Sequence, residues 1–312
     1  MLAAHSGPAT PQPHPSPDRA ISRPASVDAC APARILAPMD YYPPKHLASA
    51  AWPPGWLRPQ WPGPEPVRAF CTSREGGLSA APYDSLNLGQ HVGDRPQAVA
   101  ANRLALQQAL GVPMVFLDQV HGTEVVELPM AGADGARADG SWTRAKGLAC
   151  TVMVADCLPV LLCTLDGDRV AALHAGWRGL AGVPLLGLAQ RPVGVIESFM
   201  GRQAALGIAP ARWMAWLGPC IGPQAFEVGA EVRAAFMRHS AQSKQAFVPQ
   251  GQGKWLADLA LLARQRLESA GVSQVYGNDS SAAWCTVGNP LRFFSHRRDR
   301  VSGRFAAGIW LD

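Results

Sequence analysis

Apolar residues along the chain fall into short runs that are separated by turns rich in glycine, proline and aspartate. A continuous apolar run at 148–154 predicts a buried strand. Two further runs, at 160–165 and 169–174, flank Asp166-Gly167-Asp168, and this pattern predicts a β-hairpin. The other expected strands are 67–73, 115–120, 214–218, 291–297 and 304–311.

Helical spacing of apolar residues predicts helices over 95–110, 228–239 and 256–271. The first is bracketed by Asp94 as the expected N-cap, by Pro96 in its first turn and by Gly111 after its last turn. Gly271 ends the third. Strands and helices alternate irregularly, which favours an α+β fold: a single domain of mixed β-sheets flanked by helices. The sequence shows no internal repeat and no clear second domain.

The first 66 residues differ from this body because they are crowded with proline, alanine and serine. Proline neither donates to a sheet ladder nor fits a helix interior, so residues 1–66 are expected to form a Pro-rich, largely irregular N-terminal extension. Its later aromatic residues are expected to pin it to the body: Trp52, Trp56 and Trp61. Met39 offers an alternative start, and the sequence leaves open whether residues 1–38 are translated.

Composition describes an ordinary soluble globular protein of 312 residues, with 48% hydrophobic and 16% charged residues. These values exclude a coiled coil, a collagen-like chain and a wholly disordered chain. The net charge of +5 is scattered, and the one dense basic run, 296–300, is interrupted by Asp299. Because nucleic-acid surfaces are usually patches or stripes of Lys and Arg, no nucleic-acid partner is expected.

The lack of a recognisable targeting signal and the pattern of cysteines predict a cytoplasmic protein. No apolar run reaches the ~18–20 residues of a membrane helix, and the N-terminus has no apolar segment typical of a secretion signal. The 7 cysteines are odd in number and widely spaced, with no CxxC pair. We therefore expect a reducing compartment, in which a special cysteine is a ligand or a nucleophile rather than half of a disulfide.

Residues able to do chemistry gather in three short segments, each at the end of an apolar strand and beside small residues. They are Gln119-Val120-His121-Gly122, Ala155-Asp156-Cys157-Leu158-Pro159 and His174-Ala175-Gly176-Trp177-Arg178-Gly179. His121, Cys157 and His174 make a three-ligand zinc set that leaves a fourth position for water or substrate, which is typical of a catalytic site.

The alternative for each cysteine is a small core residue. That interpretation fits Cys150 and Cys163, which lie inside apolar runs. Cys157 lies in a loop beside Asp156, so a core thiol and a functional thiol remain equally open there. His91 is either a fourth polar group of the site or a turn residue.

The order of motifs along the body resembles the YfiH-like family, also labelled polyphenol oxidase or laccase-like. The matching segments are TSREGGLSAAPYDSLNLGQHVGD (72–94), DQVHGTEVV (118–126), ADCLPVLL (155–162), HAGWRGLAG (174–182), LGPCIGPQAFEVG (217–229), DLALLARQRLESAGV (258–272), CT (285–286) and FFSHRRDRVSGRFAAGIWL (293–311). The resemblance identifies residues 67–312 as a YfiH-like catalytic domain and does not cover the extension.

This resemblance implies a zinc site made by the His of QVHG, the Cys of ADC and the His of HAGWRG, which are His121, Cys157 and His174. It also implies phosphorolysis of adenosine, inosine and S-methyl-5′-thioadenosine, with an adenosine deaminase side activity. Members of the family are further linked to the editing of peptidoglycan precursors. The expected partners are therefore purine nucleosides and phosphate, with neither nucleic acid nor a membrane involved.

The laccase label conflicts with the histidine content. A multicopper oxidase surrounds its coppers with many histidines in HxH pairs, whereas this chain has 8 histidines and no HxH. Copper is therefore expected only as an adventitious occupant of the Cys-His-His site, where it binds such ligands more tightly than zinc.

Phosphorolysis needs a cationic site for the phosphate anion. Arg178, close to the HAGW motif, and Arg74, beside two glycines, are the candidates, although either can instead form a structural ion pair. Deamination needs a proton shuttle, and the H-x-E and P-C-x-x-C signatures of the common zinc deaminases are absent. Asp156 is the nearest carboxylate to the ligands in sequence, so it is the candidate shuttle.

One segment departs from the family pattern. Relative to this pattern, residues 183–192 form an insertion before the segment VGVIESFM, and they contain two prolines. We expect a surface loop there, which changes the rim of the pocket and leaves the metal ligands in place.

Three hypotheses follow from these residues. The first is a zinc-dependent purine nucleoside phosphorylase. The second is a cysteine-dependent amide hydrolase or peptidoglycan-precursor editing factor, with Cys157 as nucleophile and His121 or His174 as its base. The third is a non-catalytic metal-binding interaction protein. The sequence leaves the preferred nucleoside and the oligomeric state open.

Overall fold

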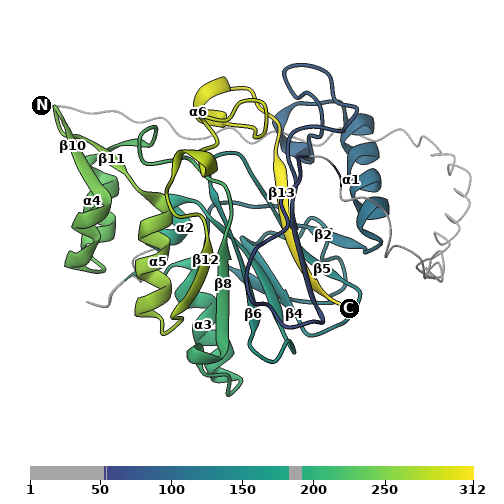
Figure 1. The fold of residues 1–312 in the computed structure, drawn as a ribbon, viewed down its shortest axis with the longest axis horizontal. Helices are drawn as coiled ribbons and strands as arrows, with labels where there is room; N and C mark the ends of the chain where they lie inside the picture. The colour runs from purple at the N-terminus through teal and green to yellow at the C-terminus, as the bar shows by residue number, and fades with distance from the viewer. Residues whose placement is uncertain (1–52, 54, 183–191) are drawn as a thin grey trace, which may run out of the picture. The chain divides into compact units, whose positions relative to one another are not determined.

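Two β-sheets form the centre of the body (Figure 1). The structure is a computed structural model, and it describes residues 53, 55–182 and 192–312. The four-stranded sheet is formed, in this order, by β1 (Val67–Cys71), β13 (Phe305–Leu311), β5 (Ala149–Val154) and β2 (Met114–Phe116). The six-stranded sheet is formed by β12 (Gln274–Gly277), β8 (Trp213–Leu217), β6 (Leu158–Thr164), β7 (Val170–Ala175), β4 (Gly140–Thr143) and β3 (Val125–Leu128).

A small third sheet and the helices complete the described part. The third sheet has the order β10 (Phe247–Gly251), β11 (Lys254–Ala257) and β9 (Glu227–Gly229). The helices are α1 (Pro96–Leu110), α2 (Trp177–Ala181), α3 (Val195–Ala205), α4 (Ala230–Met237), α5 (Leu259–Ser269) and α6 (His296–Asp299). Short 3-10 helices lie at Gln90–Val92, Pro210–Arg212, Ala241–Ala246 and Ala282–Trp284. Among the described residues, no helix combines the length and the apolar character needed to cross a membrane.

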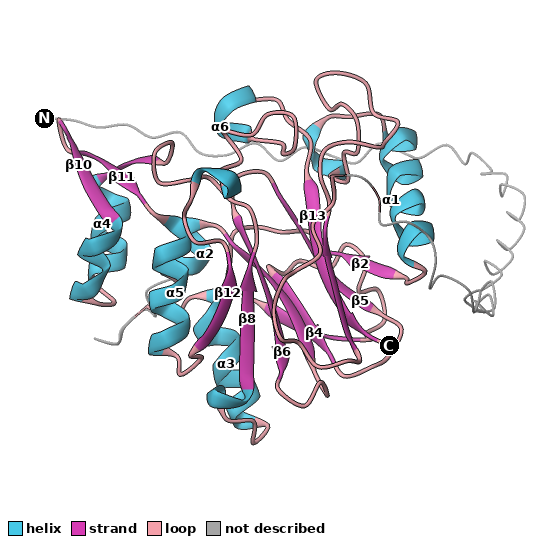
Figure 2. Cartoon of the chain, viewed as in Figure 1, coloured by secondary structure: helices cyan, strands magenta, loops and turns pink. Residues whose placement is uncertain are grey.

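The elements stack in layers because the central strands are apolar on both faces. In β6, Val160 and Leu162 face α3 and α5, whereas Leu161 and Cys163 face the four-stranded sheet. On the opposite side of that sheet, Phe70 and its neighbours pack against α1. Figure 2 shows α1 on one side of the sheets and the other long helices on the opposite side. This arrangement confirms the expected mixed architecture of sheets flanked by helices.

Several sequence predictions hold at the level of single elements. β6 and β7 form the expected antiparallel hairpin, with Cys163 opposite Val170. α1 ends at Gly111, which has a φ of 66°, a conformation that favours glycine. The N-cap of α1 is Arg95 and not Asp94. The carboxylate of Asp94 instead accepts hydrogen bonds from the backbone of Arg95 and from side chains of the preceding loop.

The strand predicted at 115–120 is shorter in the structure, and the strand predicted at 291–297 is absent. The strand β2 ends at Phe116 and does not reach Gln119. At Gln119 the backbone of β5 is bonded by a side-chain amide and not by the backbone of a neighbouring strand. Gln119 Nε2 donates to the Met153 carbonyl at 2.8 Å, and its Oε1 accepts from the Met153 amide at 2.8 Å. Residues 291–297 form a turn and the start of α6, where the Ser295 hydroxyl accepts a hydrogen bond from the Arg298 amide.

The end of the predicted extension packs on the body. The Trp56 ring lies 6.4 Å from the Phe70 ring, and Trp61 packs against the core between the two sheets. Leu57 forms an antiparallel bridge with Cys71. These contacts confirm the pinning role expected of Trp56 and Trp61. Trp52 and residues 183–191 of the predicted insertion at 183–192 lie outside the described residues. The division of the chain at residue 66 stays a prediction.

Candidate metal centre

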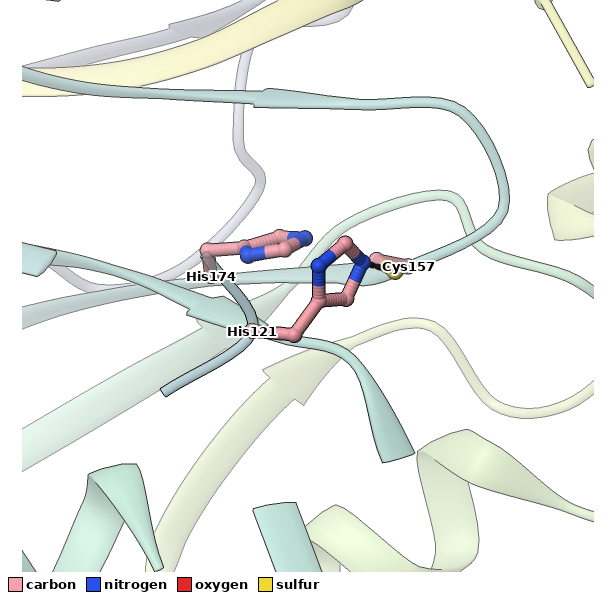
Figure 3. A group of neighbouring side chains, drawn as sticks. All are labelled: His121, Cys157 and His174. Atoms are coloured by element: carbon pink, nitrogen blue, oxygen red, sulfur yellow. Dashed lines mark hydrogen bonds between the residues drawn. The ribbon is translucent and has the colours of Figure 1, made fainter. Parts of the chain in front are cut away.

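His121, Cys157 and His174 come together at one edge of the sheets (Figure 3). Their donor atoms all lie within 4.8 Å of one another, and Cys157 Sγ is 3.6 Å from His121 Nε2. The hairpin explains part of this approach: Cys157 immediately precedes β6, and the next residue but one, Pro159, pairs with His174 on β7. His121 reaches them from the loop that follows β2.

The backbone around the cluster is strained and closely packed. His121 has a φ of 60° and Asp156 a φ of 89°, conformations that residues with a side chain rarely adopt and that often mark functional sites. Gly176 lies so close that a Cβ added there would stand 2.9 Å from Cys157 Sγ and 2.9 Å from His121 Cδ2. The glycine of the HAGW motif therefore keeps space free between the donor groups.

Asp139 holds this cluster together and was missed by the sequence analysis. The carboxylate is fully buried and accepts backbone hydrogen bonds from Val120, His121 and Gly122, at 3.2, 2.8 and 2.6 Å. Its Oδ1 also lies 2.8 Å from His174 Nδ1. This contact fixes the His174 ring and leaves Nε2 as its free donor atom. The one sequence signal of Asp139 is that it directly precedes β4. In a single sequence, an aspartate at that position cannot be distinguished from an ordinary turn residue.

The charges of the three groups depend on one another. Burial by itself raises the pKa of the Cys157 thiol, but the positive charge of His174 and hydrogen bonds from His121 and His174 lower it to about 6. Burial lowers the pKa of His174, but the Cys157 thiolate and the Asp139 carboxylate raise it to about 9. Burial raises the pKa of Asp139, and the hydrogen bond from His174 together with backbone amides holds it below its ordinary value. These shifts favour a Cys157 thiolate paired with a His174 imidazolium when no metal is bound.

This pairing predicts the reactivity of the metal-free protein. Alkylation of Cys157 by iodoacetamide is expected to be half-maximal near pH 6, because the thiolate persists down to that pH and protonates below it. Mass spectrometry of the Cys157 peptide as a function of pH measures this profile. Burial raises the pKa of Cys150 and Cys163 to about 12, so these thiols serve as slow internal references. A midpoint near 8.5 for Cys157, the value of a free thiol, would contradict the prediction.

The cluster forms part of the wall of a cavity of about 380 Å³. Arg178 and Asp156 line this cavity, as does His91. Both carboxylate oxygens of Asp156 are engaged: Oδ1 accepts from the Thr286 hydroxyl at 2.6 Å, and Oδ2 accepts from the Arg297 amide at 2.6 Å. Asp156 thus ties the Cys157 loop to the start of α6.

Arg74 does not line this cavity. Its guanidinium donates to the backbone carbonyls of Asp84 and Pro290, both at 2.9 Å, and lies 4.8 Å from the centre of the Phe294 ring. Arg74 also lies 3.3 Å from the Asp84 carboxylate, an ion pair of the kind that the sequence left open as its alternative role.

Basic residues near the C-terminus line the same cavity and were also missed. They are His296, Arg297, Arg300 and Arg304. His296, Arg297 and Arg300 belong to the dense basic run at 296–300, and Arg304 lies in the same 293–311 motif. α6 and the loop after it bring these residues to the cavity that the donor cluster also lines.

The residues present fit a metal ion such as zinc. One thiolate and two imidazoles are the donor types that zinc prefers, and the carboxylate–histidine contact of Asp139 is the support that metal-binding histidines usually have. Gly176 leaves room for an ion between the donors, and the cavity gives access to a fourth position. The geometry therefore defines a candidate metal site, and the donor set does not by itself identify the metal.

A mixed α/β body with a His–Cys–His cluster in a cavity wall defines a class of candidate metalloprotein. Comparison with known proteins gives the family: residues 68–312 match the model of the family described as multi-copper polyphenol oxidoreductase laccase. The chain belongs to this family, whose members include the YfiH proteins.

Relatives and solved structures agree with this assignment. The chain is 48% identical over 257 residues to a protein of Pseudomonas aeruginosa named purine nucleoside phosphorylase, covering 82% of this chain and 98% of the relative. It is 47% identical over 255 residues to purine nucleoside phosphorylase YfiH of Escherichia coli, covering 81% and 97%. A crystal structure of a Neisseria meningitidis protein of family DUF152 superposes with a TM-score of 0.74 at 44% identity, covering 83% of this chain and 99% of that one. YlmD of Geobacillus stearothermophilus gives a TM-score of 0.74 at 30% identity, covering 84% and 98%.

Proposed function

We propose that this protein is a zinc-dependent purine nucleoside phosphorylase that acts on adenosine, inosine and S-methyl-5′-thioadenosine. The observation that carries the proposal is the His121–Cys157–His174 cluster in the wall of a cavity that is also lined by arginines. The names of the Pseudomonas and Escherichia relatives, both purine nucleoside phosphorylases, support the same activity.

In this proposal His121, Cys157 and His174 hold the zinc ion, and Asp139 orients His174 through Nδ1. When bound, zinc supplies a Lewis acid at the wall of the cavity. Arg178 supplies a guanidinium to the phosphate, whose charge and planar donor geometry suit that anion. The Arg178 guanidinium lies 4.4 Å from the centre of the Trp177 ring, and this contact holds it at the cavity. It forms no ion pair with any of the described residues, so its charge is free to bind the anion.

Adenosine deamination is the proposed side activity, with Asp156 as proton shuttle. Asp156 lines the cavity next to Cys157, and both of its oxygens accept hydrogen bonds. These hydrogen bonds hold the side chain in place and occupy both oxygens, which leaves the carboxylate less free to carry a proton to and from the substrate. Deamination is therefore proposed as slower than phosphorolysis.

The test is product analysis with adenosine, with and without phosphate. Adenine is expected only when phosphate is present and the protein is loaded with zinc. Chromatography separates adenine from inosine, so inosine as the main product would show that deamination is the principal chemistry. Absence of turnover by a protein that contains stoichiometric zinc would contradict the nucleoside proposal.

A cysteine-dependent amide hydrolase acting on peptidoglycan precursors is the second candidate. The pairing of Cys157 with His121 and His174, which lowers the pKa of the thiol to about 6, favours it. The two candidates exclude each other chemically because a thiolate bound to zinc is not free to attack. An active protein without metal would support the hydrolase and overturn the phosphorylase. Copper, which the family description mentions, is proposed only as an adventitious occupant.

A further inference from the structure

Arg300 has a backbone conformation that residues with a side chain rarely adopt. Its φ is 63° and its ψ is −57°, and the Val301 amide donates to the Asp299 carbonyl at 2.7 Å. This is a γ-turn with positive φ, which is rare and strained. Strain of this kind persists only where surrounding contacts enforce it, and it concentrates at functional sites.

The contacts that enforce the turn come from its neighbours. Arg298 forms two hydrogen bonds to the Asp299 carboxylate, both 2.7 Å long, and donates to the Thr286 carbonyl at 2.7 Å. The amide of Arg297 donates to Asp156, the residue before Cys157. The turn that carries Arg300 is thus fixed to the same loop as the candidate metal ligand.

The side chain of Arg300 differs from those of the arginines around it. The guanidiniums of Arg297 and Arg304 donate to backbone carbonyls and thereby serve the fold. Arg300 is exposed, lines the cavity, and has no hydrogen-bond or ion-pair partner for its guanidinium among the described residues. A strained turn therefore presents an unused set of planar donors to the cavity.

The charge balance of the cavity indicates which ligand these donors suit. Asp156 is the one carboxylate among the described residues that line the cavity, and its oxygens are already occupied. A guanidinium with five N–H donors binds tetrahedral oxyanions through two parallel hydrogen bonds.

We propose that Arg300 is a specificity-determining residue that binds the inorganic phosphate used in the reaction, in the cavity that the candidate metal ligands also line. This inference rests on the proposed phosphorolysis and deepens it, because it assigns the second substrate to a residue of the α6 turn. Arg178 and Arg300 then supply the two guanidiniums that are free to bind the anion.

Arg300→Gln tests the proposal because glutamine removes the charge and retains a polar side chain at the same strained position. The KM for phosphate is expected to rise about 10- to 100-fold, the range for loss of a hydrogen bond to a charged group. The KM for adenosine is expected to change by less than about twofold. Arg300→Lys, which keeps the charge and loses the planar fork, is expected to fall between the wild type and Arg300→Gln. Arg238→Gln, an exposed arginine outside the cavity, is the control.

Arg300→Gly separates a binding role from a structural one. Glycine adopts positive φ without strain, so this variant is expected to melt no lower than the wild type while its KM for phosphate rises as in Arg300→Gln. A fall in melting temperature together with parallel changes in all kinetic constants would show that Arg300 serves the fold, and would overturn the proposal. An unchanged KM for phosphate in Arg300→Gln would overturn it as well.

Calorimetric titration of the zinc-loaded full chain with inorganic phosphate separates this inference from the proposed function. Loss of phosphate binding in Arg300→Gln, in a protein that does not cleave nucleosides, would support the anion site while the phosphorylase proposal fails. Equal phosphate binding by the wild type and Arg300→Gln, or no binding by either protein, would overturn the anion site whatever the activity.

Discussion

Replacing Cys157 with serine is expected to abolish both metal binding and phosphorolysis. A serine hydroxyl stays protonated at neutral pH and is a poor zinc ligand, whereas the Cys157 thiolate is the anionic donor of the cluster. Because loss of a merely supporting residue costs about 10- to 100-fold in metal affinity, loss of this donor is expected to exceed ~100-fold. Elemental analysis of the purified protein and the adenosine assay measure the two effects.

Cys285→Ser is the matched control for that experiment. Cys285 is buried, and its sulfur accepts hydrogen bonds from the Gly222 and Gly288 amides, a role that a serine hydroxyl can take over. It lies outside the cavity of the metal cluster, so this variant is expected to keep its metal. A Cys157→Ser protein that retains stoichiometric metal and loses activity would point to a nucleophilic cysteine and contradict the ligand assignment.

Asp139→Asn is expected to weaken both the metal site and the fold. When the asparagine oxygen takes the place of Oδ2, it keeps the hydrogen bonds from the Val120 and Gly122 amides. Its NH₂ group then stands where Oδ1 accepted from the His121 amide and from His174 Nδ1, and it can accept from neither. The proton of His174 is then favoured on Nε2, where the metal needs a lone pair, so metal affinity is expected to fall about 10- to 100-fold. Breaking a buried charge pair costs about 3–5 kcal/mol of stability. Zinc competition titration and denaturant unfolding measure these two changes.

The control is Asp118→Asn, which alters an exposed aspartate in the loop after β2, near His121 in sequence. This variant is expected to bind metal and unfold like the wild type. If Asp139→Asn behaves in the same way as this control, the carboxylate does not orient His174 in the manner argued above.

Elements with a local signal were predictable from the sequence. The β6–β7 hairpin follows from two apolar runs around Asp166-Gly167-Asp168, and the end of α1 follows from Gly111. The prediction of β2 failed where a side chain, and not the backbone, bonds the neighbouring strand. Gln119 pairs with Met153 through its amide and ends β2 early. Phe293 and Phe294 are buried although their segment is a turn, so their apolar character predicted burial correctly and strand structure wrongly.

The site shows the same division. The cluster of His121, Cys157 and His174 was foreseen because each residue follows or ends an apolar run beside small residues, and such strand ends meet at one edge. Asp139 and Arg300 were not foreseen. Both depend on the three-dimensional fold. Asp139 contacts His174 on the neighbouring strand, and Arg300 lies in a turn whose strained backbone has no local sequence pattern. Contacts between segments so far apart in the chain leave no periodic pattern in a single sequence.

The position of β13 has a consequence for synthesis of the protein on the ribosome. β13 is translated after β1 and β5, yet it lies between them and joins them into one sheet. Until β13 has been made, β1 and β5 both present open edges, the kind of edge that pairs wrongly with other chains. A chain shortened before residue 305 therefore contains all three candidate metal ligands and lacks the strand that joins β1 to β5.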